Sequence, residues 1–429
     1  MLFYKNIVLT CTQYATAVSL LLLLGCDNVD ESKSTKTVKL TTGLQVCESL
    51  NFESDTFQLS DSNDSQLDVF ESLFLNNNAY QLPGNPTREN LYAFFKDLRK
   101  GYFQKDEGID YSFVRKEYHT FTHAMDVMIT THALLNSGGA VYLNSGERAA
   151  LVLAALGHDA LHTGVNNSFL IQTNHAYFQD IGGNSLQEIR SAKYVLQLLD
   201  KHRILVTSDA MNDTQINEIQ NARNIIEQSI LWTDIKRHKE QMESVALAKE
   251  NILNLLNQER LIQALEGIAG AGKIDINQGL NLSALLDVDT KILIASFILH
   301  CADVSNPGKD WEKCERWAVL VMNEFFSQGD LQKKLGLKPS MNCDRSVVSV
   351  PGCQVGFGKF VIRDLYVLLQ EILHDGGGYL LDNFNSNQEK WKVLHTKSKE
   401  SASPYTMIFL PPSKEGGWMG QLRTDEKKL

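Results

Sequence analysis

The sequence has few features that would support a structural metal module or a disulfide framework. Its 429 residues include seven cysteines, which form no C-x-x-C pair and show no ligand-like clustering with histidine. The usual structural zinc modules are therefore excluded. An odd number of cysteines without regular spacing also defines no set of disulfides, so the cysteines do not reveal the compartment in which the protein works.

An excess of positive charge is missing as well. The 41 lysines and arginines are outnumbered by 51 aspartates and glutamates, which gives a formal net charge of -10. This excludes a protein that neutralises nucleic-acid phosphates along a broad basic surface, and we expect no nucleic-acid partner. A small anionic substrate would need a local cation instead, and a bound metal ion could supply it.

The apolar stretch at the N-terminus is too short to predict a membrane-spanning helix. It follows Lys5 and ends in Leu23-Leu24-Gly25-Cys26, after which the chain turns polar. This pattern predicts a signal peptide over residues 1–25. Its end resembles a bacterial lipobox, which implies lipidation of Cys26 and a lipoprotein anchored to a membrane, facing the periplasm or the cell exterior. An ordinary cleaved signal, giving a soluble secreted or periplasmic protein, and a short membrane anchor are the alternatives.

The remaining chain divides by composition. Residues 26–65 are rich in Ser, Thr, Asp, Glu and Lys and poor in aromatics, which predicts a lipid-anchored, flexible tether. Beyond it helical periodicity recurs, strand-like alternation is scarce and no internal repeat is visible. We therefore expect one all-α domain over residues 66–410. Residues 411–429 are expected to form a flexible tail.

Two predicted apolar helices each lead into a carboxylate. Ser145 is expected to cap the first helix, which delivers His158 and Asp159 into the interior. Asp289 is expected to cap the second, which ends at Asp303. A buried carboxylate without a partner would be costly, and a divalent cation could compensate both of these charges.

Other helix ends are marked by capping residues and glycines. Thr87 is expected to cap one helix, and Asp310 is expected to begin an amphipathic helix that Gly329 stops. A further helix is expected to start near Gln354 and to be closed by the glycines at 376–378.

Histidine is concentrated in three short segments, residues 118–126, 158–162 and 300–303. A spacing of four places His119 and His123 on one helix face, and a second pair in the 158–162 segment has the same spacing. Any one such pair is more often a surface or hydrogen-bonded core feature than a metal site. Together with two carboxylates, the three segments predict mixed nitrogen and oxygen ligands, the set expected for zinc beside magnesium or manganese.

The order of these segments, followed by residues 164–169, 301–307, 324–330 and 354–357, resembles the class I cyclic-nucleotide phosphodiesterases of the HD superfamily. The resemblance implies a compact all-α fold with a two-metal site at the helix ends. It also implies roles for particular residues: metal ligation by His123, His158, Asp159 and Asp303; general-acid catalysis by His119; orientation of the attacking water by His162, Glu188 and Thr233; and substrate binding by Tyr118, Asn306, Gln354 and Phe357.

The resemblance predicts hydrolysis of 3′,5′-cyclic nucleotides to 5′-monophosphates, with cAMP favoured over cGMP because Asn306 and Gln354 occur together. An HD-type phosphohydrolase acting on another nucleotide or phosphoester, and a non-catalytic membrane-tethered sensor, are the alternatives. Without the metal motifs, Gln354 and Phe357 would be read as a helix N-terminus and a core residue. Thr120 and Leu161 depart from the family pattern, which bears on the surroundings of the metals more than on the ligands themselves.

Overall fold

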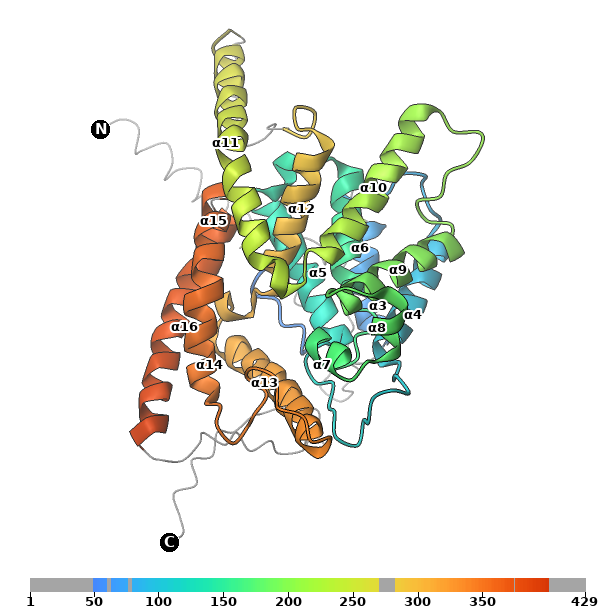
Figure 1. The fold of residues 1–429 in the computed structure, drawn as a ribbon. Helices are drawn as coiled ribbons and strands as arrows, with labels where there is room; N and C mark the ends of the chain where they lie inside the picture. The colour runs from blue at the N-terminus through green and yellow to red at the C-terminus, as the bar shows by residue number, and fades with distance from the viewer. Residues whose placement is uncertain (1–48, 60–62, 76–78, 270–281, 374, 401–429) are drawn as a thin grey trace, which may run out of the picture. The chain divides into compact units, whose positions relative to one another are not determined.

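A computed structural model describes residues 49–59, 63–75, 79–269, 282–373 and 375–400. Over these residues the chain is helical and contains no strand, so the all-α prediction is confirmed (Figure 1). The elements are α3 Asn63–Phe74, α4 Arg88–Phe103, α5 Phe121–Asn136, η1 Gly139–Tyr142, α6 Ser145–Gly157, α7 Asn167–Gln172, α8 Ala176–Ile181, α9 Leu186–Lys201, α10 Asp213–Leu231, η2 Ile235–Arg237, α11 His238–Ala269, α12 Val288–Asp303, η3 Asn306–Gly308, α13 Trp311–Lys334, α14 Val350–Phe357, η4 Gly358–Ile362, α15 Arg363–Leu373 and α16 Asp375–Glu400.

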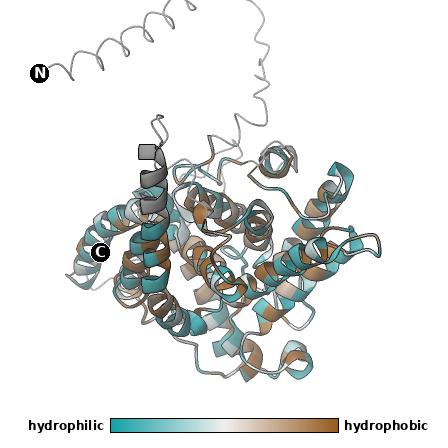
Figure 2. Cartoon of the chain, turned by 90° about the horizontal axis from the view of Figure 1, so that it is seen from above, coloured by the Kyte–Doolittle hydropathy of each residue, from teal (hydrophilic) through white to brown (hydrophobic). Residues whose placement is uncertain are grey.

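The centre of the domain is built from α5, α6, α10 and α12, which pack on one another. In α6 every side chain from Ala149 to Gly157 is buried, because this stretch is apolar on all sides and other helices surround it. Outer helices carry hydrophilic residues on their exposed faces (Figure 2). The start of α5 and the ends of α6 and α12 meet at one end of this central group, since the side chains that they carry are in contact.

The two central helices are capped by neighbours of the residues that the sequence suggested. Asn144 rather than Ser145 caps α6, because its side chain accepts a hydrogen bond from the backbone N–H of Glu147. The Glu147 carboxylate in turn accepts a hydrogen bond from the backbone N–H of Asn144. Asp287 rather than Asp289 caps α12 by accepting from the Thr290 N–H. The predictions for Thr87 and Asp310 as helix caps are confirmed.

Two predicted glycine stops are wrong. Gly329 lies inside α13, where a side chain would meet the backbone carbonyl of Cys343 at 1.8 Å. The glycine there permits close packing of a loop against the helix. The glycines at 376–378 lie in the first turn of α16. A Cβ atom added at Gly377 would lie 2.3 Å from the backbone of Gln370 in α15.

The helix expected to start near Gln354 begins earlier, at Val350, and continues through a π-helical segment, η4, into α15. Gly358 starts this segment, and an added Cβ there would lie 2.2 Å from Nε2 of Gln388 in α16. The amide of Gln388 donates to the main-chain oxygen of Gln354 over 3.2 Å. The π-helical segment thus lies directly after Gln354 and Phe357, the residues expected to bind a base. Such segments are frequent at functional sites.

Part of the stretch expected to be a tether packs on the domain. We call residues 51–59 the N-terminal strap. Within it Phe52 stacks on Tyr379 of α16 with ring centroids 4.8 Å apart, and Thr56 is 2% exposed. Contacts of the domain therefore begin before residue 66.

The predicted signal peptide, Cys26, most of the tether and the tail at 411–429 lie outside the described residues. Among the helices that the structure does describe, none combines the length and apolar character needed to cross a membrane.

Candidate active site

Four side chains expected to bind metal converge where α5, α6 and α12 meet. His123 lies in the first turn of α5, His158 and Asp159 directly follow α6, and Asp303 is the last residue of α12. Nε2 of His123 lies 3.0 Å from Oδ1 of Asp303 and 3.7 Å from Oδ2 of Asp159. Nε2 of His158 lies 3.1 Å from Oδ2 of Asp159 and 3.3 Å from Oδ1 of Asp303.

The polar atoms of this group fit a divalent cation. Nε2 of His158 and Oδ2 of Asp159 are buried and have no hydrogen-bond partner among the described residues. Nδ1 of His158 lies 2.8 Å from the carbonyl of Ala155, which can only accept, so Nδ1 carries a proton and Nε2 is the atom that faces the carboxylates. A backbone carbonyl that orients a histidine in this way is typical of metal ligands.

The charges of the group also favour a cation. Burial alone would lower the pKa of His158, but Asp159 and Asp303 outweigh it and raise that pKa well above its usual value. Burial opposes the ionised form of Asp303 too, yet His158 and His123 lower its pKa below the usual range. The ionised carboxylates of Asp159 and Asp303 make this a site of negative charge, which a divalent cation would neutralise better than a proton.

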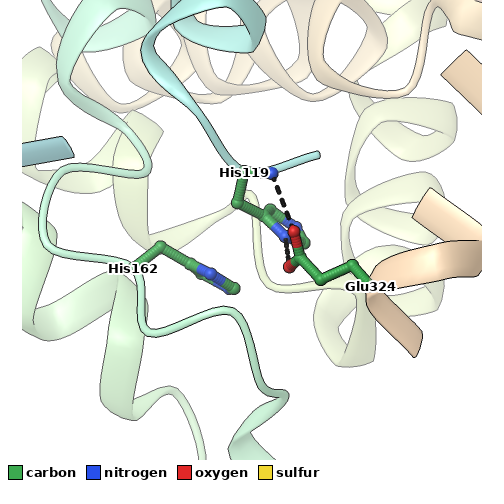
Figure 3. Close-up of side chains that lie close together, drawn as sticks. All are labelled: His119, His162 and Glu324. Carbon is green, nitrogen blue, oxygen red and sulfur yellow. Dashed lines mark hydrogen bonds and ion pairs between the residues drawn. The ribbon is translucent and has the colours of Figure 1, made fainter. Parts of the chain in front are cut away.

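His119 forms a second group with Glu324 of α13 (Figure 3). The Glu324 carboxylate lies in very close contact with Nδ1 of His119 and also accepts the backbone N–H groups of Tyr118 and His119, over 2.9 and 3.2 Å. Burial opposes the charge of His119, but Glu324 and Asp159 outweigh it and raise its pKa to about 9. Burial likewise opposes the charge of Glu324, and His119 lowers its pKa to about 2. His119 is therefore protonated at neutral pH.

His162 lies against His119, with the two rings stacked at 3.8 Å between centroids. Its Nε2 lies 2.9 Å from the side-chain amide nitrogen of Gln187. Burial and the positive charge of His119 lower the pKa of His162 to about 3, so this imidazole is neutral. The stacked pair consists of one charged and one neutral ring.

Glu188 and Thr233 bond to residues other than the four metal-binding candidates. The carboxylate of Glu188 accepts from Asn167 over 2.9 Å. Burial and the nearby Asp234 raise its pKa to about 7, and Asp159 adds a smaller effect in the same direction. The Thr233 hydroxyl donates to the carbonyl of Ile230 over 2.8 Å. In the described part of the chain, neither residue hydrogen-bonds to the four candidates.

The residues expected to bind substrate form two pairs. The amide nitrogen of Asn306 donates to the Tyr118 hydroxyl over 2.5 Å, and Oδ1 of Asn306 is buried with no partner among the described residues. Gln354 and Phe357 lie three residues apart in α14, which places them on one side of that helix, and both are half-buried. The structure thus brings Tyr118 and Asn306 into direct contact and places Gln354 and Phe357 on a separate element.

Sequence reasoning missed the role of Glu324 and Gln187. Glu324 belongs to a segment that the resemblance had singled out, but its position on a helix did not reveal that it faces His119. The local pattern gave no signal, because the residues that share its helix face at spacings of three and four, Ser327 and Gln328, are polar although they are buried. For Gln187 no signal in the sequence linked it to His162.

Comparisons with known proteins point to one family. Residues 118–383 match the family described as 3′5′-cyclic nucleotide phosphodiesterase. A probable 3′,5′-cyclic phosphodiesterase of Caenorhabditis elegans is 30% identical over 279 residues, 65% of this chain and 32% of the relative. A dual specificity calcium/calmodulin-dependent 3′,5′-cyclic nucleotide phosphodiesterase of Drosophila melanogaster is 30% identical over 284 residues, 66% and 28% of the two chains. The chain spans about a third of the length of these curated relatives.

Solved structures share the fold. The phosphodiesterase domain of the Salpingoeca rosetta rhodopsin phosphodiesterase superposes with a TM-score of 0.63 at 20% identity, covering 85% of this chain and 97% of that one. The structure of LmjPDEB1 in complex with IBMX gives a TM-score of 0.61 at 22% identity, covering 83% and 98%.

Proposed function

Because the chain belongs to the 3′5′-cyclic nucleotide phosphodiesterase family, we propose that it hydrolyses 3′,5′-cyclic nucleotides to 5′-monophosphates. The observation that carries the proposal is the convergence of two imidazoles, those of His123 and His158, each of which lies 3.0 to 3.7 Å from the carboxylates of Asp159 and Asp303, next to the protonated His119. A group of imidazole and carboxylate ligands beside a protonated histidine suits the hydrolysis of a phosphodiester.

These four residues would hold two divalent ions, zinc together with magnesium or manganese, because their nitrogen and oxygen atoms suit both kinds of ion. When bound, such a pair lowers the pKa of a water molecule and neutralises charge on the phosphate. His162, Glu188 and Thr233 are proposed to orient that water. Support for Glu188 comes from its burial and from the influence of Asp159 on its pKa.

His119 is proposed to supply the proton that the leaving group needs. In the reaction a water oxygen forms a bond to phosphorus and the bond from phosphorus to the 3′ oxygen breaks, so the electron pair on that oxygen must take up a proton. Glu324 fixes the orientation of His119 and keeps it protonated. The neutral His162 cannot provide this proton. A well-placed acid contributes about 10²–10⁴-fold to the rate.

Base recognition is proposed to involve Asn306, Gln354 and Phe357. An amide can donate and accept at once, and an aromatic ring can stack on a purine. Since the amide nitrogen of Asn306 is engaged by Tyr118, its free Oδ1 is an acceptor. Adenine offers an exocyclic amine that can donate to it, whereas guanine offers a carbonyl at the same position. This supports a preference for cAMP.

The experiment is to supply the purified full-length protein with Zn²⁺ and Mg²⁺, offer a panel of 3′,5′-cyclic nucleotides and identify the products. We expect 5′-monophosphates, with 5′-AMP formed fastest. His119→Asn should reduce kcat by about 10²-fold or more while leaving the bound metal unchanged. If the metal-loaded protein leaves every 3′,5′-cyclic nucleotide intact but hydrolyses other phosphoesters, the proposed substrate class is wrong.

The location of the protein is a separate proposal, supported by the sequence alone. We propose that cleavage before Cys26 and lipidation of its sulfur anchor the chain to a membrane outside the cytoplasm. Mass spectrometry of the mature N-terminus should then find a lipid-modified cysteine as the first residue. A mature chain that starts elsewhere with an unmodified N-terminus would contradict this.

A further inference from the structure

The N-terminal strap, residues 51–59, precedes the segment that the family model matches, which starts at residue 118. It nevertheless touches two residues that lie directly behind the candidate active site. One contact is a buried hydrogen bond to α5, the helix that carries His123. The other is an aromatic contact with α13, the helix that carries Glu324.

The hydrogen bond joins the Thr56 hydroxyl to Oδ1 of Asp126 over 3.0 Å. Asp126 is 1% exposed and follows His123 by three residues on α5, so both lie in adjacent turns. The same oxygen accepts from Nζ of Lys309 over 2.6 Å. Oδ2 of Asp126 has no partner among the described residues. Thr56 and Lys309 are therefore the groups that compensate this buried charge, and loss of either leaves it underbonded.

Lys309 links the same point to the proposed base-binding residue. It follows Asn306 by three residues, and its carbonyl and that of Pro307 both accept from the side-chain amide of Asn387, over 2.7 and 3.0 Å. The turn that presents Asn306 is thus held between Asp126 on one side and α16 on the other. Asp126 therefore connects the Thr56 hydroxyl both to the helix that carries His123 and to the turn that presents Asn306.

The aromatic contact is made by Phe57. The centroid of its ring lies 4.4 Å from that of Trp317. The guanidinium of Arg316 lies over the Phe57 ring, 3.7 Å from the same centroid. Trp317 is 1% exposed and packs edge-on against Tyr118 and His123, at 5.6 Å from each. Phe57 therefore packs against Trp317, which in turn contacts the metal-ligand candidate His123 and the substrate-binding candidate Tyr118.

We propose that Thr56 and Phe57 are positioning residues of the active site. They hold α5 and Trp317 so that the imidazole of His123 and the Tyr118–Asn306 pair keep their places. The strap thus completes the site from outside the segment that the family model matches. Phe52 belongs to the same strap but stacks on Tyr379 of α16 and makes neither of these contacts, so it anchors the strap without touching the residues behind the site.

This difference within one segment provides the test. The full-length protein and its variants Thr56→Val, Phe57→Leu, Thr56→Ser and Phe52→Leu are stripped of metal. Their Mn²⁺ dissociation constants are then measured by calorimetry, together with their melting temperatures. Thr56→Val removes the hydroxyl at nearly constant size, whereas Thr56→Ser retains it. Phe52→Leu is the matched control for Phe57→Leu, because both replace a strap phenylalanine by the same smaller residue.

We expect Thr56→Val and Phe57→Leu to weaken Mn²⁺ binding by about three- to tenfold, less than the 10–100-fold typical of residues that touch a ligand directly. Thr56→Ser should restore binding, and Phe52→Leu should lower the melting temperature with Mn²⁺ affinity unchanged. Unchanged affinity in both Thr56→Val and Phe57→Leu, or equal weakening in Phe52→Leu, would overturn the proposal.

The proposal rests on the proposed function only for its consequence on catalysis, and the two can fail separately. Where the wild-type protein hydrolyses cyclic nucleotides, Thr56→Val should lower kcat at saturating metal, and Thr56→Ser should recover it. A protein that binds Mn²⁺ with the expected pattern among the variants but hydrolyses no cyclic nucleotide would retain the positioning role and lose the proposed activity.

Discussion

The imidazole of His119 and the carboxylate of Glu324 form a partly buried ion pair between two segments that are 205 residues apart in the sequence. The same carboxylate also receives the backbone N–H groups of Tyr118 and His119. Three bonds to one side chain fix both the main chain and the ring of His119. The charge and the orientation of the proposed acid are therefore set by a residue on another helix.

Replacement of Glu324 should change the pH dependence of hydrolysis. The ordinary pKa of histidine is 6.5, and in this site it is raised to about 9, with Glu324 the largest contribution in that direction. Because the acid works only when protonated, activity should fall as pH rises through the pKa of His119. In Glu324→Gln this alkaline limb of kcat/KM should move to lower pH. An alkaline limb at the same pH in both proteins would show that another group is titrating.

The same pair should make stability depend on pH at both ends. The pKa of Glu324 falls from 4.5 to about 2 on folding, so its contribution is present above 4.5 and is lost as pH falls toward 2. The pKa of His119 rises from 6.5 to about 9, so its contribution is present below 6.5 and is lost as pH rises toward 9. A double-mutant cycle with His119→Asn and Glu324→Gln, followed by denaturant unfolding of metal-free protein, should give the largest coupling between pH 4.5 and 6.5. Coupling independent of pH would contradict the ion pair.

Asn306 should contribute to the choice between purines. Its free Oδ1 is positioned to accept a hydrogen bond, which adenine can donate. Asn306→Ala should therefore lower kcat/KM for cAMP more than for cGMP, by about tenfold for one lost hydrogen bond of roughly 1–1.5 kcal/mol. The ratio of the two kcat/KM values is the measurement. A parallel loss for both substrates would indicate that Asn306 only orients Tyr118.

Two glycines in neighbouring elements should respond in opposite ways to alanine. A methyl group at Gly329 would meet the carbonyl of Cys343 at 1.8 Å, so Gly329→Ala should destabilise the protein by about 1–3 kcal/mol. Gly356 lies within α14 with nothing near an added Cβ, so Gly356→Ala should stabilise it by up to about 1 kcal/mol. The free energies of unfolding by denaturant compare the two. Equal effects would mean that the loop at Cys343 moves aside freely.

The sequence was sufficient to predict the helical class, because periodic apolar stretches such as that of α6 leave few alternatives. Helical spacing of the histidines and the carboxylates at the ends of apolar helices predicted that these segments come together, and the structure confirms that the side chains meet. The choice of four of these residues as metal-binding candidates came from the resemblance.

Other features depend on contacts that no local pattern contains. The glycine at 329 looked like a helix stop, because only the packed loop at Cys343 explains it. Residues 51–59 have the polar composition of a tether, yet three of their side chains, those of Phe52, Thr56 and Phe57, are fixed by partners more than sixty residues away. Single contacts of this kind override composition, since each adds a buried group without changing the overall hydrophobicity.

The metal dependence of cAMP hydrolysis tests the central claim most directly. Full-length protein is stripped with a chelator, and the formation of 5′-AMP is followed by chromatography before and after Zn²⁺ and Mg²⁺ are returned, with Asp303→Asn treated in the same way. We expect no product from the stripped protein, recovery after the metals are added, and no recovery in Asp303→Asn. Product formation that persists in the stripped protein, or equal recovery in Asp303→Asn, would contradict a centre built from His123, His158, Asp159 and Asp303.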